Sequence, residues 1–287
     1  MALSSLVISD VHLDARPLTP NVERRDAALA EVIARSAQSA HQRRSRFEVV
    51  CAGDLFDYDV HPYEVIDAPS AQTATSEILA RHPRVTSALV ETLRRGDRVV
   101  VLPGNHDSAL RLKRVRNHLQ AIFRAASRPD ANLLTPSWLY RSPTGVHIEH
   151  GDAYDPLCVT RLSNETLDPS VGSVCARYLP DMIPDGDPYA KDPFQLGVSP
   201  RTIIDRLRPQ RALPFLQELL AVPTEGGLCP RAVREMVANE RIPEPLLQRH
   251  AELRVPKATA LDATQSLMGD VTYGQLLDDQ AKRAMQG

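Results

Sequence analysis

The sequence predicts an α/β fold built around a buried, mainly parallel sheet. Three short apolar segments, at residues 5–9, 47–53 and 97–104, have the length and composition of strands. Helical segments separate them, in which apolar residues recur every three or four positions. Alternation of this kind indicates βαβ units, because parallel neighbours in a sheet need a crossover connection between them.

The remaining elements follow in order along the chain. The first helical segment covers residues 21–40, and a second covers 74–96 with an interruption near Pro83. A basic amphipathic helix is expected at 111–126, and a β-hairpin over 132–151 that turns near Pro143 to Gly145.

The second half of the chain has a different character. Residues 157–199 are rich in Pro, Asp and Gly without a clear period, and the rest is helix-like with proline breaks. We therefore expect one domain over residues 1–156 and a helix-rich insertion or cap region over 157–287.

Composition limits the class of protein. The 287 residues are 43% apolar and 24% charged, which is close to the average for globular domains. A formal net charge of −2 gives no overall basic field, so nucleic acid is not indicated as a partner. No segment reaches the roughly 18 to 20 apolar residues of a membrane span, and the N-terminus lacks the basic region of a signal peptide.

The cysteines bear on the cellular compartment. Cys51, Cys158, Cys175 and Cys229 are scattered without C-x-x-C spacing, which argues against a disulfide scaffold or a thiolate zinc site. We therefore expect a protein of the reducing cytoplasm.

Polar side chains follow the predicted strands at the point where each strand ends. In an open α/β sheet, ligands bind outside the carboxyl ends of the strands, so we expect these groups to converge. The four sets are Asp10 with His12, Asp54 with Asp57, Asn105 with His106 and Asp107, and His150 with Asp152.

The chemistry of these groups indicates metal binding. Carboxylate, imidazole and amide oxygen together suit two divalent first-row ions such as Mn, Fe, Zn, Ni or Co, rather than Ca or a structural Zn. Two such ions, roughly 3.5 to 4 Å apart, need a bridging carboxylate, and they can clamp a phosphoryl group while activating a water. Asp54 follows the middle strand and is the expected bridge.

The motifs resemble those of the calcineurin-like metallophosphoesterases. They are D-x-H at Asp10–His12, G-D-x-x-D at Gly53–Asp57 and G-N-H-D at Gly104–Asp107, followed by a further histidine. The resemblance implies a calcineurin-like four-layer α/β/β/α sandwich, incomplete at the C-terminus, with a largely helical C-terminal region. It also implies metal-dependent hydrolysis of a phosphomonoester, phosphodiester or pyrophosphate by a water that two metal ions activate.

The resemblance further implies a role for each residue of the motifs. The expected ligands are Asp10, His12 and Asp54 for the first ion and Asp54, Asn105 and His150 for the second. His106 would face the substrate, where it would stabilise the phosphoryl charge or protonate the leaving oxygen, and Asp57 would orient its ring. Imidazole suits this task because its pKa lies near neutral pH.

Simpler interpretations of the same residues stay open. Asp10 and Asp54 could cap helices or turns, and Asp57 could be a turn residue. His147 competes with His150 as a ligand; we favour His150 because it stands at the strand end, before a glycine that permits close backbone approach.

Several further polar residues have open roles. Asp107, Asp152 and Asp155 could hydrogen-bond metal-bound imidazoles or be solvated turn residues. Tyr58, His61 and Arg111 follow the motifs closely enough to reach a substrate. Four histidines in helix-like segments are expected to be exposed or packed: His41, His82, His118 and His250.

The last motif of the family pattern, G-H-x-H, is absent, and its two histidines would complete the two metal shells. No histidine follows His250. Residues 273–287 resemble a helix that ends on Gly287, as residues 87–96 end on a glycine directly before a strand. We expect a chain that stops before the strand with this motif; the alternatives are a divergent member with weakened metal binding and a non-catalytic binding or scaffold protein.

Overall fold

The computed structural model describes residues 2–152, 158, 160–163 and 166–178. Residues 2–151 belong to one compact unit, which contains all the predicted motifs. Most of the predicted helix-rich region lies outside the described residues, and the division of the chain at residue 156 stays a prediction.

The core of this unit is a parallel sheet of four strands. They are β1 (Leu3–Ile8), β2 (Arg46–Ala52), β3 (Arg98–Leu102) and β4 (Asn132–Leu134), and they lie side by side in that order. In the register, Val50 of β2 pairs with Val7 on one side and Val100 on the other. The predicted α/β class with a mainly parallel sheet is confirmed, and β2 is the middle one of the three motif-bearing strands.

The predicted hairpin over 132–151 is correct only in its second part. Residues 132–134 form β4, which pairs in parallel with β3. The hairpin itself consists of β5 (Tyr140–Arg141) and β6 (His147–Ile148), which pair antiparallel around the expected turn at Pro143 to Gly145. A run of three residues is too short to show its partner by periodicity, and the preceding helix supplies the crossover that a parallel partner needs.

The first helix, α1, runs from Pro20 to Gln42. Its N-terminus has a proline in the first turn, and Oγ1 of Thr19 accepts a hydrogen bond of 3.3 Å from the Val22 amide. These are the usual signals of a helix start. The 3₁₀ turn Ser108–Arg111 and the helix α4 (Lys113–Ala126) follow β3.

The long helical segment predicted at 74–96 is two helices, α2 (Ala68–Arg81) and α3 (Pro83–Arg94). The break at Pro83 is confirmed. However, α2 begins earlier than the apolar period indicates, because Asp67 caps it. Oδ1 of Asp67 accepts from the Ser70 amide at 2.9 Å, while the Asp67 amide donates to Oγ of Ser70 at 3.2 Å.

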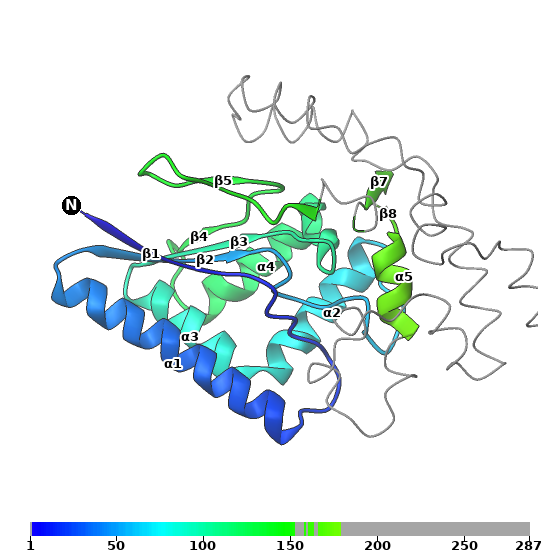
Figure 1. Ribbon diagram of the computed structural model, residues 1–287, viewed down its shortest axis with the longest axis horizontal. Coiled ribbons are helices and arrows are strands. Elements are labelled where there is room, and N and C mark those ends of the chain that lie inside the picture. Colours follow the sequence, from blue (N-terminus) through cyan, green and yellow to red (C-terminus); the bar gives the residue numbers. More distant parts are fainter. Residues whose placement is uncertain (1, 153–157, 159, 164–165, 179–287) are drawn as a thin grey trace, which may run out of the picture. The chain divides into compact units, whose positions relative to one another are not determined.

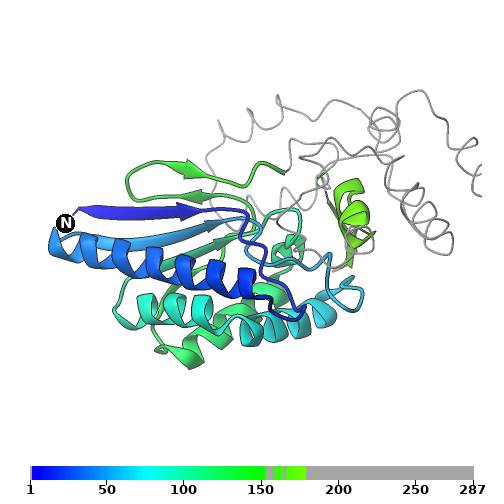
Figure 2. The ribbon, with the colours of Figure 1, turned by 60° about the horizontal axis from the view of Figure 1, so that its bottom comes forward.

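The helices and the hairpin lie on opposite faces of the main sheet. Figure 1 labels α1 to α4 beside β1 to β4, and Figure 2 shows the helices on one side of the sheet and the β5–β6 hairpin on the other. Alternate residues of a strand share a face, so the even-numbered residues of β2 and β3 lie on the face under the hairpin. Val50, Ala52, Val100 and Leu102 form one buried cluster there with Tyr140 and Ile148.

Three short elements follow the hairpin in sequence. They are β7 (Arg161–Ser163), β8 (Thr166–Asp168) and α5 (Val171–Tyr178). None of the helices in the described part of the chain is long and apolar enough to span a bilayer.

A buried polar cluster fastens the hairpin to the sheet. Glu48 of β2 is fully buried, and its carboxylate accepts hydrogen bonds from Oγ of Ser5 at 2.7 Å and from the Tyr140 hydroxyl at 2.8 Å. Nη1 of Arg98 donates to the Tyr140 hydroxyl at 2.9 Å and lies 3.3 Å from the carboxylate. A buried carboxylate needs such partners, so this cluster fixes the start of the hairpin.

Tyr140→Phe tests this cluster. The change keeps the ring but removes one donor to the Glu48 carboxylate, so we expect the free energy of unfolding to fall by about 1 to 2 kcal/mol. Urea denaturation at neutral pH measures it. Tyr63→Phe is the matched control, because Tyr63 is 39% exposed and the same change there should cost under about 0.5 kcal/mol. Equal stabilities of the two variants would contradict the assignment.

Candidate metal centre

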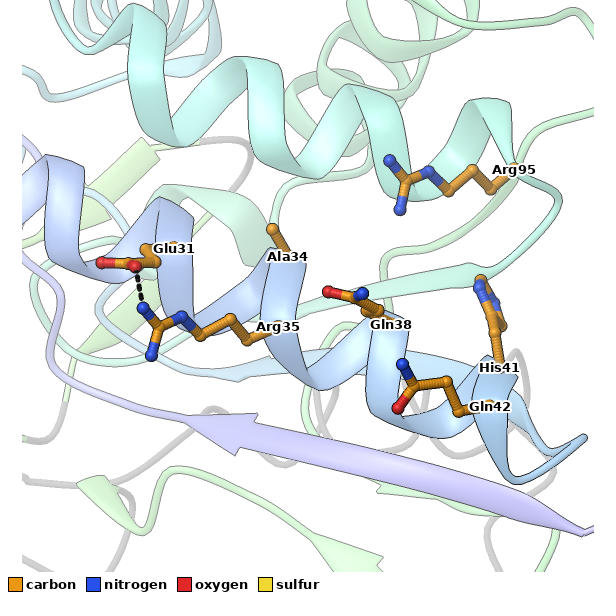
Figure 3. A pocket seen from close by; sticks show the side chains of 7 residues that line it. All are labelled: Glu31, Ala34, Arg35, Gln38, His41, Gln42 and Arg95. Carbon is orange, nitrogen blue, oxygen red and sulfur yellow. Dashed lines mark hydrogen bonds and ion pairs between the residues drawn. The ribbon is translucent and has the colours of Figure 1, made fainter.

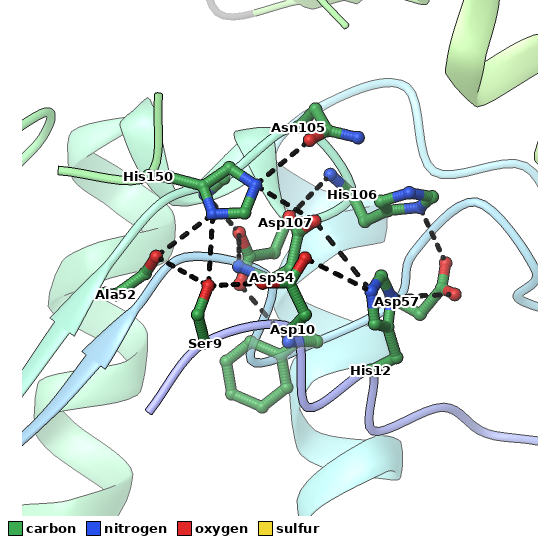
Figure 4. A network of polar contacts seen from close by, with 12 residues as sticks. Ser9, Asp10, His12, Ala52, Asp54, Asp57, Asn105, His106, Asp107 and His150 are labelled. Carbon is green, nitrogen blue, oxygen red and sulfur yellow. Dashed lines mark hydrogen bonds and ion pairs between the residues drawn. The ribbon is translucent and has the colours of Figure 1, made fainter. Parts of the chain in front are cut away.

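The predicted motif residues converge at the carboxyl ends of the parallel strands. Figure 4 shows the side chains of Asp10, His12, Asp54, Asn105 and His150 pointing toward one another. The first four follow β1, β2 and β3 directly. His150 was expected to follow a strand of the main sheet, but β6 belongs to the separate β5–β6 sheet. It follows β6 and reaches the other four side chains from the sheet face that the helices do not cover.

Backbone hydrogen bonds continue from β1 and β2 into the loops that follow. The amide of Asp10 donates to the carbonyl of Gly53 at 3.3 Å, and the amide of His12 donates to the carbonyl of Asp54 at 2.9 Å. The two loops therefore run together, which brings the D-x-H motif beside the G-D motif.

Three of the predicted ligands have a left-handed backbone conformation. Asp10, His12 and Asp54 have φ of 57°, 51° and 52°, and among the described residues only Arg44 is another non-glycine residue with positive φ. Such residues cost about 1 to 3 kcal/mol each and gather at functional sites. This favours a functional role for Asp10 and Asp54 over a simple capping role.

The first predicted ligand group is assembled. Nε2 of His12 lies 3.9 Å from Oδ1 of Asp10 and 3.9 Å from Oδ2 of Asp54. One ligand atom from each of the three residues lies within 4.8 Å of the others. The Asp10 side chain is 61% exposed and that of Asp54 only 2%, so the group is anchored at Asp54 and open to solvent at Asp10.

The second predicted ligand group is also assembled. Nε2 of His150 lies 3.2 Å from Oδ2 of Asp54 and 3.1 Å from Oδ1 of Asn105. The other ring nitrogen, Nδ1, lies 3.0 Å from the carbonyl oxygen of Ala52. A carbonyl only accepts, so Nδ1 carries a proton, and Nε2 is the ring nitrogen that faces Asp54 and Asn105. His147 is exposed, which favours His150 between the two candidates.

Asp54 stands at the centre of both groups. Its Oδ2 atom faces His12 and His150, and its Oδ1 atom accepts a hydrogen bond of 2.9 Å from the His106 amide. Burial alone would raise the pKa of Asp54, but the imidazoles of His150, His106 and His12 lower it. The carboxylate is therefore an anion, as a bridging ligand needs to be.

Two glycines leave the space that this carboxylate and His150 occupy. A Cβ atom on Gly104 would lie 2.1 Å from Oδ1 of Asp54, and one on Gly53 would lie 2.4 Å from Cγ of His150. Gly53 also has φ of +92°. Side chains at either position would push the donor atoms apart, so the donor set and the space around it fit divalent ions.

Asp57 lies between two imidazoles. Its Oδ1 atom is 3.4 Å from Nδ1 of His106, as the sequence analysis expects, and its Oδ2 atom is 3.4 Å from Nδ1 of His12. The centroids of the His12 and His106 rings are 4.7 Å apart, and the rings meet edge to face. Burial would raise the pKa of Asp57, but His106 and His12 lower it. One carboxylate therefore orients both a predicted ligand and the predicted catalytic histidine.

A second carboxylate, which lies outside the motifs, also contacts His106. Oδ2 of Asp59 lies 3.1 Å from Nδ1 of that ring. Burial would lower the pKa of His106, but Asp57 and Asp59 raise it well above its usual value. The only sequence signal is an acid two residues after the G-D-x-x-D motif.

Ligand atoms of His12, Asp57 and His106 also lie within 4.8 Å of one another. That grouping shares His12 with the first predicted site. The assignment of His106 to the substrate rather than to a metal therefore stays a prediction.

Asp107 has a role that the sequence left open. It is fully buried, and its carboxylate accepts hydrogen bonds from the amides of Gly104 at 2.6 Å, Asp54 at 3.3 Å and Phe56 at 3.2 Å. Burial and the nearby Asp54 raise the pKa of Asp107 to about 7. It binds the main chain of two motif loops together, rather than an imidazole or solvent.

Other candidates contact residues that are not predicted ligands. The Tyr58 hydroxyl lies 2.8 Å from Oγ1 of Thr75, and Arg111 donates to the Gly104 carbonyl at 3.2 Å. His61 lies beside Glu77. The expectation for the helical histidines agrees with three of them: His41 lies beside Asp97, His82 beside Asp26 and His118 beside Ser76. Asp155 and His250 lie outside the described residues.

A surface pocket of about 520 Å³ lies elsewhere, between the end of α1 and the end of α3 (Figure 3). It is near the amino ends of β2 and β3, whereas the motif residues stand at the carboxyl ends. Its charged residues have partners: Arg35 pairs with Glu31, Arg95 with Glu91 and His41 with Asp97. The pocket therefore contributes nothing to the metal centre.

Comparison with protein families identifies the family of this chain. A family model described as calcineurin-like phosphoesterase matches residues 3–210. The chain belongs to the calcineurin-like phosphoesterases. Neither the curated proteins nor the solved structures gave a match. Family membership supports metal-dependent hydrolysis of phosphate esters as the general activity and agrees with the α/β fold.

Gly104→Ala tests the space around Asp54. Because the new methyl group would overlap Oδ1 of Asp54, we expect Mn²⁺ affinity to fall about 10-fold or more. Isothermal titration of the purified chain measures this affinity. The control is Gly145→Ala, where no atom lies within 4 Å of the added Cβ. Its φ of +87° should cost about 1 kcal/mol of stability without affecting metal affinity. Unchanged affinity in Gly104→Ala would show that the overlap is relieved elsewhere.

Proposed function

We propose that this chain hydrolyses a phosphomonoester, phosphodiester or pyrophosphate with the help of two divalent ions. Asp10, His12 and Asp54 would hold the first ion, and Asp54, Asn105 and His150 the second. Mn, Fe, Zn, Ni and Co all suit these donors. The observation that carries the proposal is the position of Asp54 Oδ2, which faces Nε2 of His12 and Nε2 of His150 at once.

The outer contacts support this division of the ligands. His12 is approached at Nδ1 by Asp57, and His150 at Nδ1 by the Ala52 carbonyl, so each ring is oriented with Nε2 toward Asp54. Carboxylates and carbonyls commonly fix metal-binding imidazoles in this way. When bound, the ions would supply an activated water and would draw charge from the phosphoryl oxygens.

His106 is proposed as the group that acts on the substrate. Asp57 and Asp59 approach its Nδ1 atom, which leaves Nε2 for the phosphoryl group. These carboxylates raise the pKa of His106 well above its usual value, which favours the protonated ring. It can stabilise the negative phosphoryl oxygens, or transfer the Nε2 proton to the leaving oxygen as the bond from phosphorus to that oxygen breaks.

The cytoplasmic location is part of this proposal. It is supported by Cys51 and Cys175, which are buried free thiols.

Asp54→Asn tests the bridging role. The amide keeps the shape of the side chain but removes its charge, so we expect Mn²⁺ binding and hydrolysis of an aryl phosphate each to fall by more than about 100-fold. Metal analysis of protein purified without chelator, together with steady-state rates, measures both. Asp130→Asn is the control, since Asp130 is an exposed partner of Arg128. Full metal content and turnover in Asp54→Asn would rule out the bridge.

Metal analysis and steady-state rates of the unaltered chain distinguish an enzyme from a non-catalytic binding or scaffold protein. The Asp54→Asn variant can lose metal and activity only if the unaltered parent chain binds metal and hydrolyses the substrate. A parent that folds but neither binds Mn²⁺ nor hydrolyses a phosphate ester would support the non-catalytic binding or scaffold protein.

His106→Ala separates chemistry from metal binding. We expect metal content near that of the parent and turnover lower by roughly 10² to 10⁴-fold, the usual contribution of general acid catalysis. The loss should be smaller for an aryl phosphate, whose leaving oxygen needs no proton, than for an alkyl phosphate. Rate constants for both substrates measure this.

Two results would reassign His106. Loss of metal from His106→Ala would make it a ligand, in line with its closeness to His12 and Asp57. Equal losses for aryl and alkyl substrates would make it a stabiliser of phosphoryl charge rather than a proton donor.

A further inference from the structure

A buried imidazole outside the metal centre contacts the loop that carries Asp10 and His12. His82 stands between α2 and α3 and is 1% exposed. Its Nε2 atom lies 2.8 Å from the carbonyl oxygen of Asp14 and 3.2 Å from the Asp14 amide. Its Nδ1 atom lies 2.6 Å from Oδ2 of Asp26 on α1, which is 2% exposed.

The partners of His82 define what its ring does. A carboxylate accepts, so the contact with Asp26 places a proton on Nδ1. Nε2 then either donates to the Asp14 carbonyl or accepts from the Asp14 amide, and in both protonation states its partner is the same main chain. The ring therefore joins α1, the junction of α2 and α3, and the loop after β1.

Stability of the helix layer does not account for this pair. Removing an imidazole and a carboxylate from water costs several kcal/mol, and apolar side chains of similar size often serve a core equally well. The loop also has an apolar anchor of its own, because the side chain of Leu13 is fully buried. A hydrogen bond differs from apolar packing because it fixes both distance and direction.

The loop after β1 needs to be fixed, because Asp10 and His12 have positive φ. Strained residues persist only where their surroundings hold them in place. The loop after β2 holds this segment as far as Leu13, through backbone hydrogen bonds at Asp10, His12 and Leu13. His82 holds the segment at Asp14, two residues beyond His12.

We propose that His82, itself held by Asp26, is a positioning residue of the first metal site. By fixing the main chain at Asp14 it keeps Asp10 and His12 in the conformation that directs their ligand atoms to Asp54. The inference rests on the proposed function for the identity of the site, and it extends that site to two residues of the helix layer.

The test measures Mn²⁺ affinity of each site separately in the full 287-residue chain. His150→Ala leaves the first ligand group intact, and His12→Ala leaves the second. In the His150→Ala background we expect His82→Asn to weaken Mn²⁺ binding by about 10-fold, the lower end of the effect of losing a direct hydrogen-bond partner of a ligand. In the His12→Ala background the same change should alter affinity by less than roughly threefold.

A second substitution at the same position distinguishes positioning from general support. Asn is short and keeps an amide near the position of Nδ1, within reach of Asp26. Gln is longer and keeps an amide near the position of Nε2, within reach of Asp14. We therefore expect His82→Gln in the His150→Ala background to retain affinity within roughly threefold of its parent, unlike His82→Asn. A purely structural role would affect the two variants equally.

Tyr140→Phe is the control for loss of stability. It removes a buried hydrogen bond at the hairpin, away from the loop after β1. In the His150→Ala background it should leave Mn²⁺ affinity unchanged, and urea denaturation of every variant shows how much stability each has lost.

The possible outcomes separate this inference from the function on which it rests. Equal affinities of His82→Asn and His82→Gln, or equal losses in both backgrounds, would overturn the positioning role while leaving the metal sites in place. Failure of both the His150→Ala and the His12→Ala chains to bind Mn²⁺, with their fold intact, would overturn the metal assignment and the inference together.

Discussion

The buried carboxylate of Asp54 is the constraint on which the rest of the metal centre depends. Burial opposes its charge, so it needs partners that favour the anion, and it has them in the imidazoles of His12, His106 and His150 and in the His106 amide. These partners come from three different loops. They can reach one carboxylate only because β2 lies between β1 and β3, and because Gly53 and Gly104 leave room for close approach. The buried charge of Asp54 thus depends both on the order of the strands and on the two glycines.

Much of the fold could be predicted from the sequence, because βαβ units combine two clear periodicities. β1, β2 and β3 were expected from apolar runs, and the helix break at Pro83 from its missing amide. Two features were not predictable in this way. β4 is too short to show a period, and its partner is decided by the crossover through α4. The start of α2 depends on Asp67 and Ser70, a capping pair that lacks the usual glutamate or glutamine.

The candidate site also has features that the sequence predicts and features that it does not. The five predicted ligands stand together because residue type and position at a strand end are both visible in the sequence. Rotation of a ring is not visible there. The second contact of Asp57, the approach of Asp59 and the Ala52 carbonyl behind His150 all depend on how a ring is turned, which tertiary packing decides. Asp107 was ambiguous for a related reason, since a motif letter does not show which amides a carboxylate will reach.

Asp57 has a consequence for how such an enzyme can diverge. One of its oxygens faces His12 and the other faces His106, so a single side chain sets the orientation of the proposed metal ligand and of the proposed proton donor. The two properties are therefore inherited together: a substitution at residue 57 that changed metal preference would also change which leaving groups are tolerated. Adjustment of the donor alone would have to arise at Asp59, which approaches the same ring from outside the motif.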